Sequence, residues 1–346
     1  MIAFDLVCDS GTSSIIIGGK IDDALSYHGI DESIIITDRN VDTIYGKLFK
    51  EHKKIVIEPG EHNKSLDTVN VIYNQLSEFG ADRNTFIIAI GGGVVSDIAG
   101  YSAKTYLRGL RFGIVPTTLL SMVDASIGGK NGVNFNSFKN QIGTIKQPEF
   151  IISDYSLLAT LAMSEIKNGM AEIIKTALVA DRELYDLISL EKNKLLEILS
   201  HPQGLVNSNK NSSIFQEIIY RTAKAKAGIV DEDETEQHKR KVLNFGHTYG
   251  HAIETIYGLS HGESVSLGMC LALEMSVRRE LLDKQTANDI VTLLEFFSLP
   301  TEADFAISKL KDAVFKDKKR TKDKVQFVML QEIGQALIKE LDFQTL

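Results

Sequence analysis

The feature of this sequence that most restricts its fold is a series of short apolar runs rich in β-branched residues. Six of them precede residue 154: SSIIIGG, SIIITD, KIVIEP, TFIIAIGGG, RFGIVPTT and FIISD. Runs of this length and composition are typical of buried strands. Amphipathic stretches separate them, such as Ser65 to Phe79, which Gly80 follows as a stop signal. Alternating strands and helices predict a largely parallel sheet with helices on its faces.

The periodicity changes after about Asp154 to that of long helices. The clearest helical stretches are 164–180, 214–230, 244–257 and 261–281, and KVQFVML and QALIKEL predict a small hairpin around Gly334. A chain of 346 residues is too long for one ordinary core. We therefore expect two domains, an α/β domain over residues 1–154 and a mainly helical domain over residues 155–346.

The charge balance restricts the class of ligand. The chain has 38 Lys and Arg against 46 Asp and Glu, a formal net charge of −8, which disfavours a nucleic-acid surface. No apolar run approaches the length of a membrane span, and the N-terminus has no leader pattern. Cys8 and Cys270 match no metal-ligand spacing and suggest reduced thiols. We expect a cytoplasmic protein without nucleic-acid or membrane partners, whose cations gather at one site.

Two loops that follow predicted strands have the composition of phosphate sites. Ala89 to Asp97 contains three successive glycines and leads into a predicted helix, so backbone N–H groups could face a phosphate; a tight strand-to-helix turn is the alternative. Asp97 could orient a polar ligand or cap that helix. Pro59 to Lys64 occupies the same kind of position, and an ordinary polar loop explains it equally well.

A basic and glycine-rich region follows the helix predicted after Ala89 to Asp97. It comprises Tyr106 to Gly109, Val115 to Thr118, Met122 to Asn134 and Phe138 to Gly143. Lysines interleaved with paired glycines and buried-type residues are not the pattern of a solvated charged face. The region therefore predicts a site for an anionic ligand.

The helical half contains residues of the types that bind a catalytic metal. Glu172 and Lys175 share a helical face, although a surface ion pair would have the same spacing. His247 and His251 lie four residues apart, and His261 opens the next helix, so three of the eight histidines fall within fifteen residues. One carboxylate with two imidazoles is a common catalytic zinc set. The residues predict a metal, with the choice of imidazoles open.

These segments resemble one family, the 3-dehydroquinate synthases, which belong to the sugar-phosphate cyclases. The resemblance extends from about residue 58 to 330 and rests on GGGVVSDIAG, TYLRG, VPTTLL, VDASIGGKNGVN, KNQIG, GMAEIIK, NFGHTYGHAIE, HGESV and FKDKK. It implies a Rossmann-like N-terminal domain that binds NAD, a helical C-terminal domain, a metal ion and a homodimer.

The resemblance also implies roles for particular residues. The ligands of zinc, or of cobalt in its place, would be Glu172, His247 and His261. NAD would contact Pro59, Gly60, Glu61, His62, Asn63, Lys64, Gly93, Val94, Val95, Ser96, Asp97, Thr117, Thr118, Lys130, Lys139, Leu157, Leu158, Ala159 and Thr160. The sugar-acid phosphate substrate would contact Arg108, Asp124, Lys130, Asn140, Lys175, Lys226, Arg240, Asn244 and His251, with Arg108 supplied by the other subunit of a dimer.

Three segments depart from the family pattern. Thr160 to Glu165 lacks the usual Pro and Arg, residues 239–241 lack the glycine that usually precedes Arg240, and residues 135–138 replace a His-Pro type of loop. These departures affect loop shape, and the spacing of Arg240 from Asn244 is kept. Between Lys318 and Lys319 the sequence does not decide which residue faces the pocket.

The activity implied by the resemblance is that of a carbon–oxygen lyase in the shikimate route to aromatic amino acids. 3-Deoxy-D-arabino-heptulosonate 7-phosphate would be oxidised by NAD, lose phosphate, be reduced again and close by an internal aldol addition to 3-dehydroquinate. The alternatives are another sugar-phosphate cyclase, a metal-dependent polyol dehydrogenase, and a metabolite-binding protein without catalysis. The many lysines disfavour the dehydrogenase, and a complete metal triad disfavours the binding protein.

Overall fold

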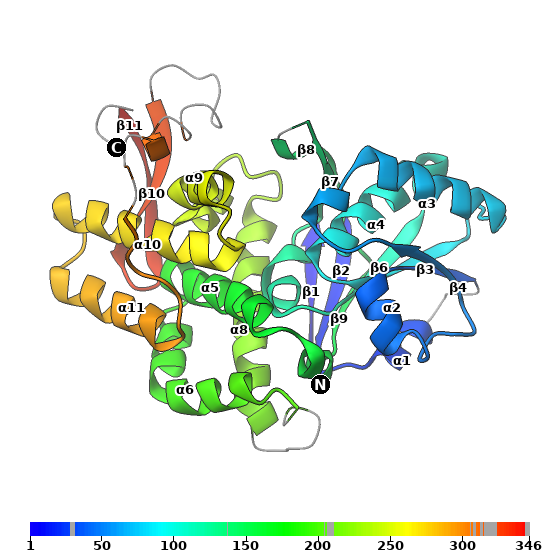
Figure 1. Ribbon diagram of the computed structural model, residues 1–346, viewed down its shortest axis with the longest axis horizontal. Coiled ribbons are helices and arrows are strands. Elements are labelled where there is room, and N and C mark those ends of the chain that lie inside the picture. Colours follow the sequence, from blue (N-terminus) through cyan, green and yellow to red (C-terminus); the bar gives the residue numbers. More distant parts are fainter. Residues whose placement is uncertain are drawn as a thin grey trace. The chain divides into compact units, whose positions relative to one another are not determined.

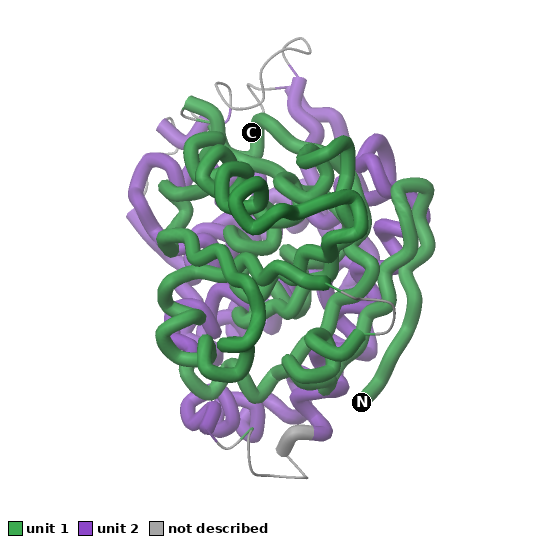
Figure 2. The backbone as a smooth tube through the Cα atoms, turned by 90° about the vertical axis from the view of Figure 1, so that its right-hand side faces the viewer, with its two compact units in different colours: residues 1–160, 205–208 green, residues 161–204, 209–346 purple. Residues whose placement is uncertain are grey.

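The computed structural model describes residues 1–27, 32–136, 138–203, 205, 211–304, 306, 309–311, 314 and 324–342. Lys318 and Lys319 lie outside the described residues. The chain forms two compact units, coloured separately in Figure 2, of residues 1–160 with 205–208 and residues 161–204 with 209–346. Among the described residues, no helix has both the length and the apolar character needed to cross a membrane.

The first unit is built on a seven-stranded sheet with the order β1-β2-β9-β6-β5-β3-β4 (Figure 1). All pairs are parallel except β1 with β2. The six apolar runs identified in the sequence are all strands of this sheet, which confirms that prediction. The bounds are β1 Ile2–Cys8, β2 Gly11–Ile17, β3 Ser33–Asp38, β4 Lys53–Ile57, β5 Phe86–Gly91, β6 Arg111–Pro116 and β9 Phe150–Ser153.

Helices cover both faces of the sheet, as the alternating pattern predicts. Side chains of α3 (Leu66–Glu78) and α4 (Gly93–Thr105) pack with Ile34 and Ile36 of β3, whereas α1 (Ile21–Leu25) and α2 (Arg39–Tyr45) pack with Ile35. Successive strand residues point to opposite faces, so an unbroken apolar run supplies both layers of core. The bounds of α3 confirm the helix predicted between Ser65 and Phe79.

The strand order places three ligand-binding candidates, the loops after β4, β5 and β6, at the carboxyl end of the sheet. From β4 at the edge, the chain returns to β5 on the other side of β3. Connections diverge at such a switch point and leave a crevice where open α/β sheets bind ligands. The loop with the short helix η1 (Glu61–Asn63) follows β4, the glycine segment follows β5, and Thr117 follows β6.

The first unit also contains two features that the sequence patterns did not reveal. Strand β1 is at the sheet edge and half exposed, so it lacks the continuous apolar run of a buried strand. A separate antiparallel hairpin, β7 (Lys130–Phe135) and β8 (Phe138–Ile145), packs beside α4 (Figure 1). Short helices η2 (Tyr106–Arg108), η3 (Ser121–Ala125) and η4 (Tyr155–Thr160) complete this unit.

The second unit is mainly helical and ends in the predicted hairpin. Gly334, with φ +91°, turns the chain between its two strands. The elements are α5 Met163–Ala180, α6 Arg182–Ser200, α8 Asn211–Glu232, η5 Lys239–Asn244, α9 His247–Tyr257, α10 His261–Arg278, α11 Lys284–Phe296, β10 Lys324–Glu332 and β11 Gln335–Asp342.

Two of the predicted helices extend beyond the observed helix ends. Helix α9 begins at His247, three residues after the predicted start at Asn244, because Gly246 adopts the left-handed conformation with φ +78° and interrupts the helix. Helix α10 ends at Arg278, before the predicted end at Leu281, because Glu280 has φ +56°. Apolar periodicity does not report these backbone reversals.

Helices α9 and α10 approach each other backbone to backbone. A Cβ atom on Gly268 of α10 would lie 2.0 Å from the carbonyl oxygen of Gly246 and 2.8 Å from the nitrogen of Gly250. Real Cβ atoms do not approach backbone atoms this closely, so only glycine permits the observed separation. This contact fixes α10 against the first turn of α9.

Replacing Gly268 by alanine tests this contact. Gly268→Ala should lower the free energy of unfolding by about 1–3 kcal/mol, because the two helices must move apart. Gly228→Ala is the matched control: Gly228 is in α8, its added Cβ would meet nothing within 4 Å, and the change should stabilise by about 0.5–1 kcal/mol. Urea unfolding of both variants measures the difference, and equal stability would contradict the packing argument.

Candidate active site

Three side chains from three helices of the second unit converge on one point. Glu172 is in the middle of α5, His247 is the first residue of α9, and His261 is the first residue of α10. One potential ligand atom from each lies within 4.8 Å of the other two. The Nε2 atoms of His247 and His261 lie 3.4 and 3.1 Å from Oε1 of Glu172. Two imidazoles and one carboxylate form the donor set of an open catalytic zinc site.

The second nitrogen of each imidazole faces an acceptor, which leaves Nε2 available as a ligand. His247 Nδ1 lies 3.1 Å from the carbonyl oxygen of Phe245, and His261 Nδ1 lies 3.8 Å from Oε2 of Glu254. Metal-ligating histidines usually donate this N–H to a carbonyl or a carboxylate, which fixes the tautomer and the ring orientation. The residues present therefore fit a small divalent cation.

Glu172 is a buried carboxylate whose charge is held by its neighbours. Its side chain is 0% exposed and that of Lys175 is 2% exposed, with Nζ of Lys175 2.5 Å from Oε2 of Glu172. The interpretation of these two residues as a surface ion pair is therefore wrong. Burial raises the pKa of Glu172, but Lys175 and His247 outweigh it and hold that pKa well below its ordinary value.

His261 is held as a cation by the same carboxylates. Burial lowers its pKa, but hydrogen bonds to Glu172 and Glu254 outweigh burial and raise the pKa of His261 to about 10. The raised pKa means that His261 binds a proton more tightly than a free imidazole does. Any ion that binds here must displace that proton.

The first turn of α10 is fixed by hydrogen bonds on either side of His261. Ser260 caps the helix with Glu263 in a reciprocal capping box. Gly262 N donates to Oδ1 of Asn168 on α5 at 2.8 Å. These contacts place the start of α10 against α5, where Glu172 lies one turn further along.

His251, the other histidine in the sequence cluster, is outside the metal group. It is exposed, and its ring meets that of His247 edge to face at a centroid distance of 5.2 Å. The geometry therefore distinguishes His261 from His251, which the spacing of the histidines could not do. His251 remains available to contact a ligand.

The second unit also buries the cations predicted to bind anions. Lys175, Lys226 and Arg240 are each no more than 6% exposed. Arg240 donates through Nη1 to the carbonyl of Glu234 at 2.5 Å, and its backbone N–H donates to Asp233 at 3.0 Å. A buried cation needs compensating acceptors, and an anionic ligand is one such partner.

The loop that lacks the family's glycine is held by two carboxylates. Asp233 accepts hydrogen bonds from the backbone N–H groups of Gln237, His238 and Arg240. Glu236 adopts the left-handed conformation with φ +60° and accepts from Nδ2 of Asn244 at 2.6 Å. The turn is therefore made without glycine, and Arg240 and Asn244 are both tied to it.

In the first unit, the glycine segment forms the N-terminus of α4. Gly92 is its N-cap and no side chain caps the helix. Asp97 lies inside α4 and forms an ion pair with Lys64, so the interpretation of Asp97 as a helix cap is wrong. A Cβ on Gly92 would lie 2.9 Å from the methyl group of Thr118, so the segment also packs closely.

The other predicted ligand-binding residues of this unit come from the loops after β4, β5, β6 and β9, from the β7–β8 hairpin and, for Arg108, from the turn before β6. Lys64 is buried, and its Nζ also donates to Oδ1 of Asn140 on β8. Thr117, Leu157, Leu158, Val95 and Ser96 are buried, Asp124 and residues 93, 94, 118 and 159 are half-buried, and Arg108, Lys130, Lys139 and Thr160 are exposed. Of the loop residues, Asn63 donates to the carbonyl of Pro59 at 2.8 Å, and Gly60 and His62 are exposed.

Sequence reasoning missed two carboxylates that lie beside proposed ligand-binding positions. Glu254 supports His261 from α9, and its place one helical turn after His251 was the available signal. Asp38 lies at the carboxyl end of β3, beside the switch point, and accepts from the N–H groups of Asn40 and Val41. Burial raises the pKa of Asp38, and these hydrogen bonds oppose that effect.

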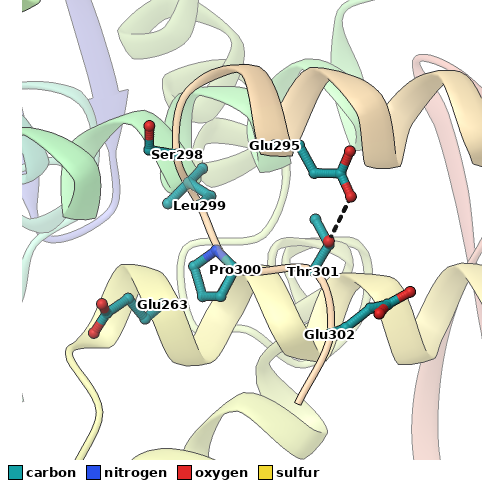
Figure 3. A pocket seen from close by; sticks show the side chains of 7 residues that line it. All are labelled: Glu263, Glu295, Ser298, Leu299, Pro300, Thr301 and Glu302. Carbon is teal, nitrogen blue, oxygen red and sulfur yellow. Dashed lines mark hydrogen bonds between the residues drawn. The ribbon is translucent and has the colours of Figure 1, made fainter.

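A cavity of about 540 Å³ in the second unit (Figure 3) is not lined by Glu172, His247 or His261. It is lined by Glu263, Glu295, Ser298, Leu299, Pro300, Thr301 and Glu302. Glu295 accepts a hydrogen bond from the Thr301 hydroxyl across it. Three carboxylates make this cavity unsuitable for an anionic substrate.

Comparison with known proteins identifies the family of this chain. The family models for the N-terminal and C-terminal regions of 3-dehydroquinate synthase match residues 54–168 and 169–320. The 3-dehydroquinate synthase of Dehalococcoides mccartyi is 39% identical over 321 residues, 90% of this chain and 86% of the relative. That of Acetivibrio thermocellus is 39% identical over 325 residues, 90% and 87% of the two chains.

The chain belongs to the 3-dehydroquinate synthase family. A solved structure with a similar fold is 2-epi-5-epi-valiolone synthase from Streptomyces hygroscopicus subsp. jinggangensis, with NAD+ and Zn2+ bound. It is 25% identical, with a TM-score of 0.85 over 98% of this chain and 95% of that one. The predicted fold class, a parallel-sheet α/β domain followed by a helical domain, is confirmed.

The contact between Glu254 and His261, a proposed metal ligand, can be tested by mutation. Glu254→Gln should weaken Zn2+ binding by about 10- to 100-fold, because the carboxylate that orients His261 and increases its basicity is lost. Glu274→Gln, which removes a surface carboxylate of α10 paired with Arg278, is the matched control. Competition with a chromophoric chelator measures both affinities. Equal Zn2+ affinity in the two variants would exclude a supporting role for Glu254.

The raised pKa of His261 predicts how metal binding depends on pH. Because His261 has a pKa of about 10 without metal, a proton must leave for each ion bound below that pH. The association constant for Zn2+ should therefore rise about tenfold per pH unit between about pH 7 and 9, with one proton released per ion from this residue. Calorimetry in buffers of different ionisation enthalpy counts the protons. A constant affinity over this range would contradict the assignment.

Proposed function

We propose that this chain catalyses the 3-dehydroquinate synthase reaction. The substrate is 3-deoxy-D-arabino-heptulosonate 7-phosphate, and the products are 3-dehydroquinate and phosphate, a step of the shikimate route. The observation that carries the proposal is the convergence of Glu172, His247 and His261 in one unit with the buried cations Lys175, Lys226 and Arg240. Membership of the 3-dehydroquinate synthase family supports the choice of substrate.

The cofactors that we propose are NAD and a zinc or cobalt ion. Glu172, His247 and His261 would hold the ion, which polarises a substrate hydroxyl when bound, while NAD accepts a hydride and later returns it. The glycines that begin α4 expose N–H groups that can receive the NAD phosphates. The valiolone synthase structure contains this same pair of cofactors.

The protein's own residues must hold a flexible, doubly anionic chain in one conformation. Arg240 offers a planar guanidinium for a carboxylate or a phosphate, and Lys175 and Lys226 supply point charges. Low exposure of these cations excludes water and strengthens their attraction for the anions. The acyclic substrate is thereby ordered for ring closure. Arg108, Asp124, Lys130, Asn140, Asn244 and His251 belong to the same proposal as substrate contacts.

Two further assignments are part of the proposal. A cytoplasmic location is supported by Cys8 and Cys270, which are free thiols. A homodimer is expected from the resemblance to the family, with Arg108 contributed to the neighbouring subunit's site. The exposed side chain of Arg108 and its backbone φ of +70° are compatible with a residue that projects toward a partner.

Recycling of the cofactor distinguishes this function from its alternatives. With catalytic NAD and excess heptulosonate phosphate, the cyclase should release phosphate and 3-dehydroquinate while NADH stays below the enzyme concentration, because hydride returns to the substrate. Phosphate release, absorbance of reduced nicotinamide and product identity are measured in one reaction. His261→Ala should abolish turnover and metal content together, and Glu274→Gln should change neither.

Other outcomes would identify a different protein. Accumulation of NADH in proportion to turnover indicates a polyol dehydrogenase. Turnover only of a different heptulose phosphate indicates another sugar-phosphate cyclase. Binding of substrate and metal without phosphate release indicates a protein that only binds metabolites. Each of these results would overturn the proposed function.

A further inference from the structure

The β7–β8 hairpin contains a large bulge at the residues proposed to bind ligand. Val133 pairs with Ile142 and Phe135 pairs with Phe138, with a register shift between the two pairs. One residue of β7, Asn134, therefore lies opposite three residues of β8, Lys139 to Gln141. A bulge of this kind redirects side chains out of the regular ladder and is common beside active sites. It determines where Lys139 and Asn140 point.

The side chain of Asn134 uses both of its ends to hold this bulge. Its Oδ1 accepts a hydrogen bond of 2.9 Å from the backbone N–H of Asn140. Its Nδ2 donates to Glu61, at 2.9 Å to Oε1 and 3.3 Å to the carbonyl oxygen. Glu61 offers only acceptors there, so the amide orientation follows from chemistry. Asn134 thus joins the bulge to the loop after β4.

A second set of contacts closes the connection. The backbone N–H of Asn134 donates to the carbonyl oxygen of Lys64 at 2.8 Å. The buried Nζ of Lys64 donates to Asp97 on α4 and to Oδ1 of Asn140. These hydrogen bonds join the loop after β4, helix α4 and the β7–β8 hairpin into one polar network. Asn134 bonds directly to the loop and to β8.

The conformation of Asn140 explains why the bulge needs support. Asn140 has φ +54°, a left-handed conformation that asparagine adopts more readily than other non-glycine residues but still at a cost in free energy. Such strain persists only where surrounding contacts impose it. The contacts on Asn140 are the bond from its N–H to Asn134 and the bond to its Oδ1 from Lys64.

We infer that Asn134 is a positioning residue for the reaction, which fixes the β8 bulge and couples it to the cofactor loop at Glu61 and Lys64. This inference rests on the proposed function, because it assigns NAD contacts to the loop and to Lys139 and a substrate contact to Asn140. Asn134 itself touches no ligand in this assignment. It keeps the side chains for both ligands in one fixed arrangement.

Substitution of Asn134 tests the inference. Asn134→Ala removes the hydrogen bonds at both ends of the amide and should lower kcat/KM for heptulosonate phosphate by about 10- to 100-fold and raise the KM for NAD. Asn84→Ala is the matched control, since Asn84 lies on an exposed turn of the same unit and bonds only to Asp82 among the contacts described for it. The kinetic constants of Asn84→Ala should stay within about twofold of those of the unsubstituted protein, because surface substitutions usually have small effects.

A compensating pair separates positioning from general stability. Asn134→Asp keeps the acceptor for Asn140 but turns a second carboxylate oxygen toward Glu61, so it should lose as much activity as Asn134→Ala. Adding Glu61→Gln restores a donor and acceptor pair and, at saturating NAD because Glu61 is itself a proposed NAD contact, should recover at least about tenfold of the loss in kcat/KM for heptulosonate phosphate. Thermal unfolding of all variants is recorded in parallel. Loss of activity only in proportion to loss of folded protein would overturn the inference.

Hydrogen exchange gives a readout that does not depend on turnover. In Asn134→Ala, peptides that cover residues 59–65 and 138–145 should exchange faster, while those of β5 and β6 should not change. Unchanged exchange in both peptides, or wild-type kcat/KM in Asn134→Ala, would refute the positioning role. If the unsubstituted protein fails to convert heptulosonate phosphate, the proposed function is wrong. Faster exchange would then still establish that Asn134 holds the bulge.

Discussion

The second unit depends on the burial of one charged carboxylate. Glu172 sits inside α5 with no exposed surface, a position that would strongly destabilise an isolated charge. Lys175 on the same helix and the imidazoles of His247 and His261 compensate it. The two imidazoles belong to the first residues of two other helices. The starts of α9 and α10 must therefore lie at closely defined positions relative to Glu172. The Gly268 contact and the capping box of α10 meet that requirement.

The first unit contains a buried cation, Lys64, whose charge also needs compensation. Lys64 is compensated by Asp97 and by the amide of Asn140, so a surface-type loop acquires a fixed place beside α4. In each unit, a buried lysine next to a carboxylate marks the residues proposed for chemistry. Such groups are held before a ligand arrives, so little ordering remains to be done on binding. Stability and pre-organisation have the same physical origin here.

The sequence predicted best those elements whose burial is continuous along the chain. The β5 run is buried on both faces, and its apolar pattern has no other simple explanation. Strand β1 alternates and is half exposed, and the β7–β8 hairpin carries polar residues and a bulge, so neither has a clear period. The start of α9 was misplaced because Gly246 reverses the backbone, a change that apolar spacing does not reveal.

The sequence by itself determined the types of residue available for chemistry, six of the strands of the main sheet with the change to a helical second half, and the resemblance to the 3-dehydroquinate synthases. The spacing of the histidines left the choice between His251 and His261 open, the resemblance favoured His261, and the tertiary structure places His261 against Glu172. Only the tertiary structure decided that Asp97 pairs with Lys64 and does not cap its helix. The physical reason is the sequence distance over which helical spacing predicts contacts. Helical spacing fixes neighbours within a turn or two, whereas Glu172 and His261 are 89 residues apart and meet because α5 and α10 pack together.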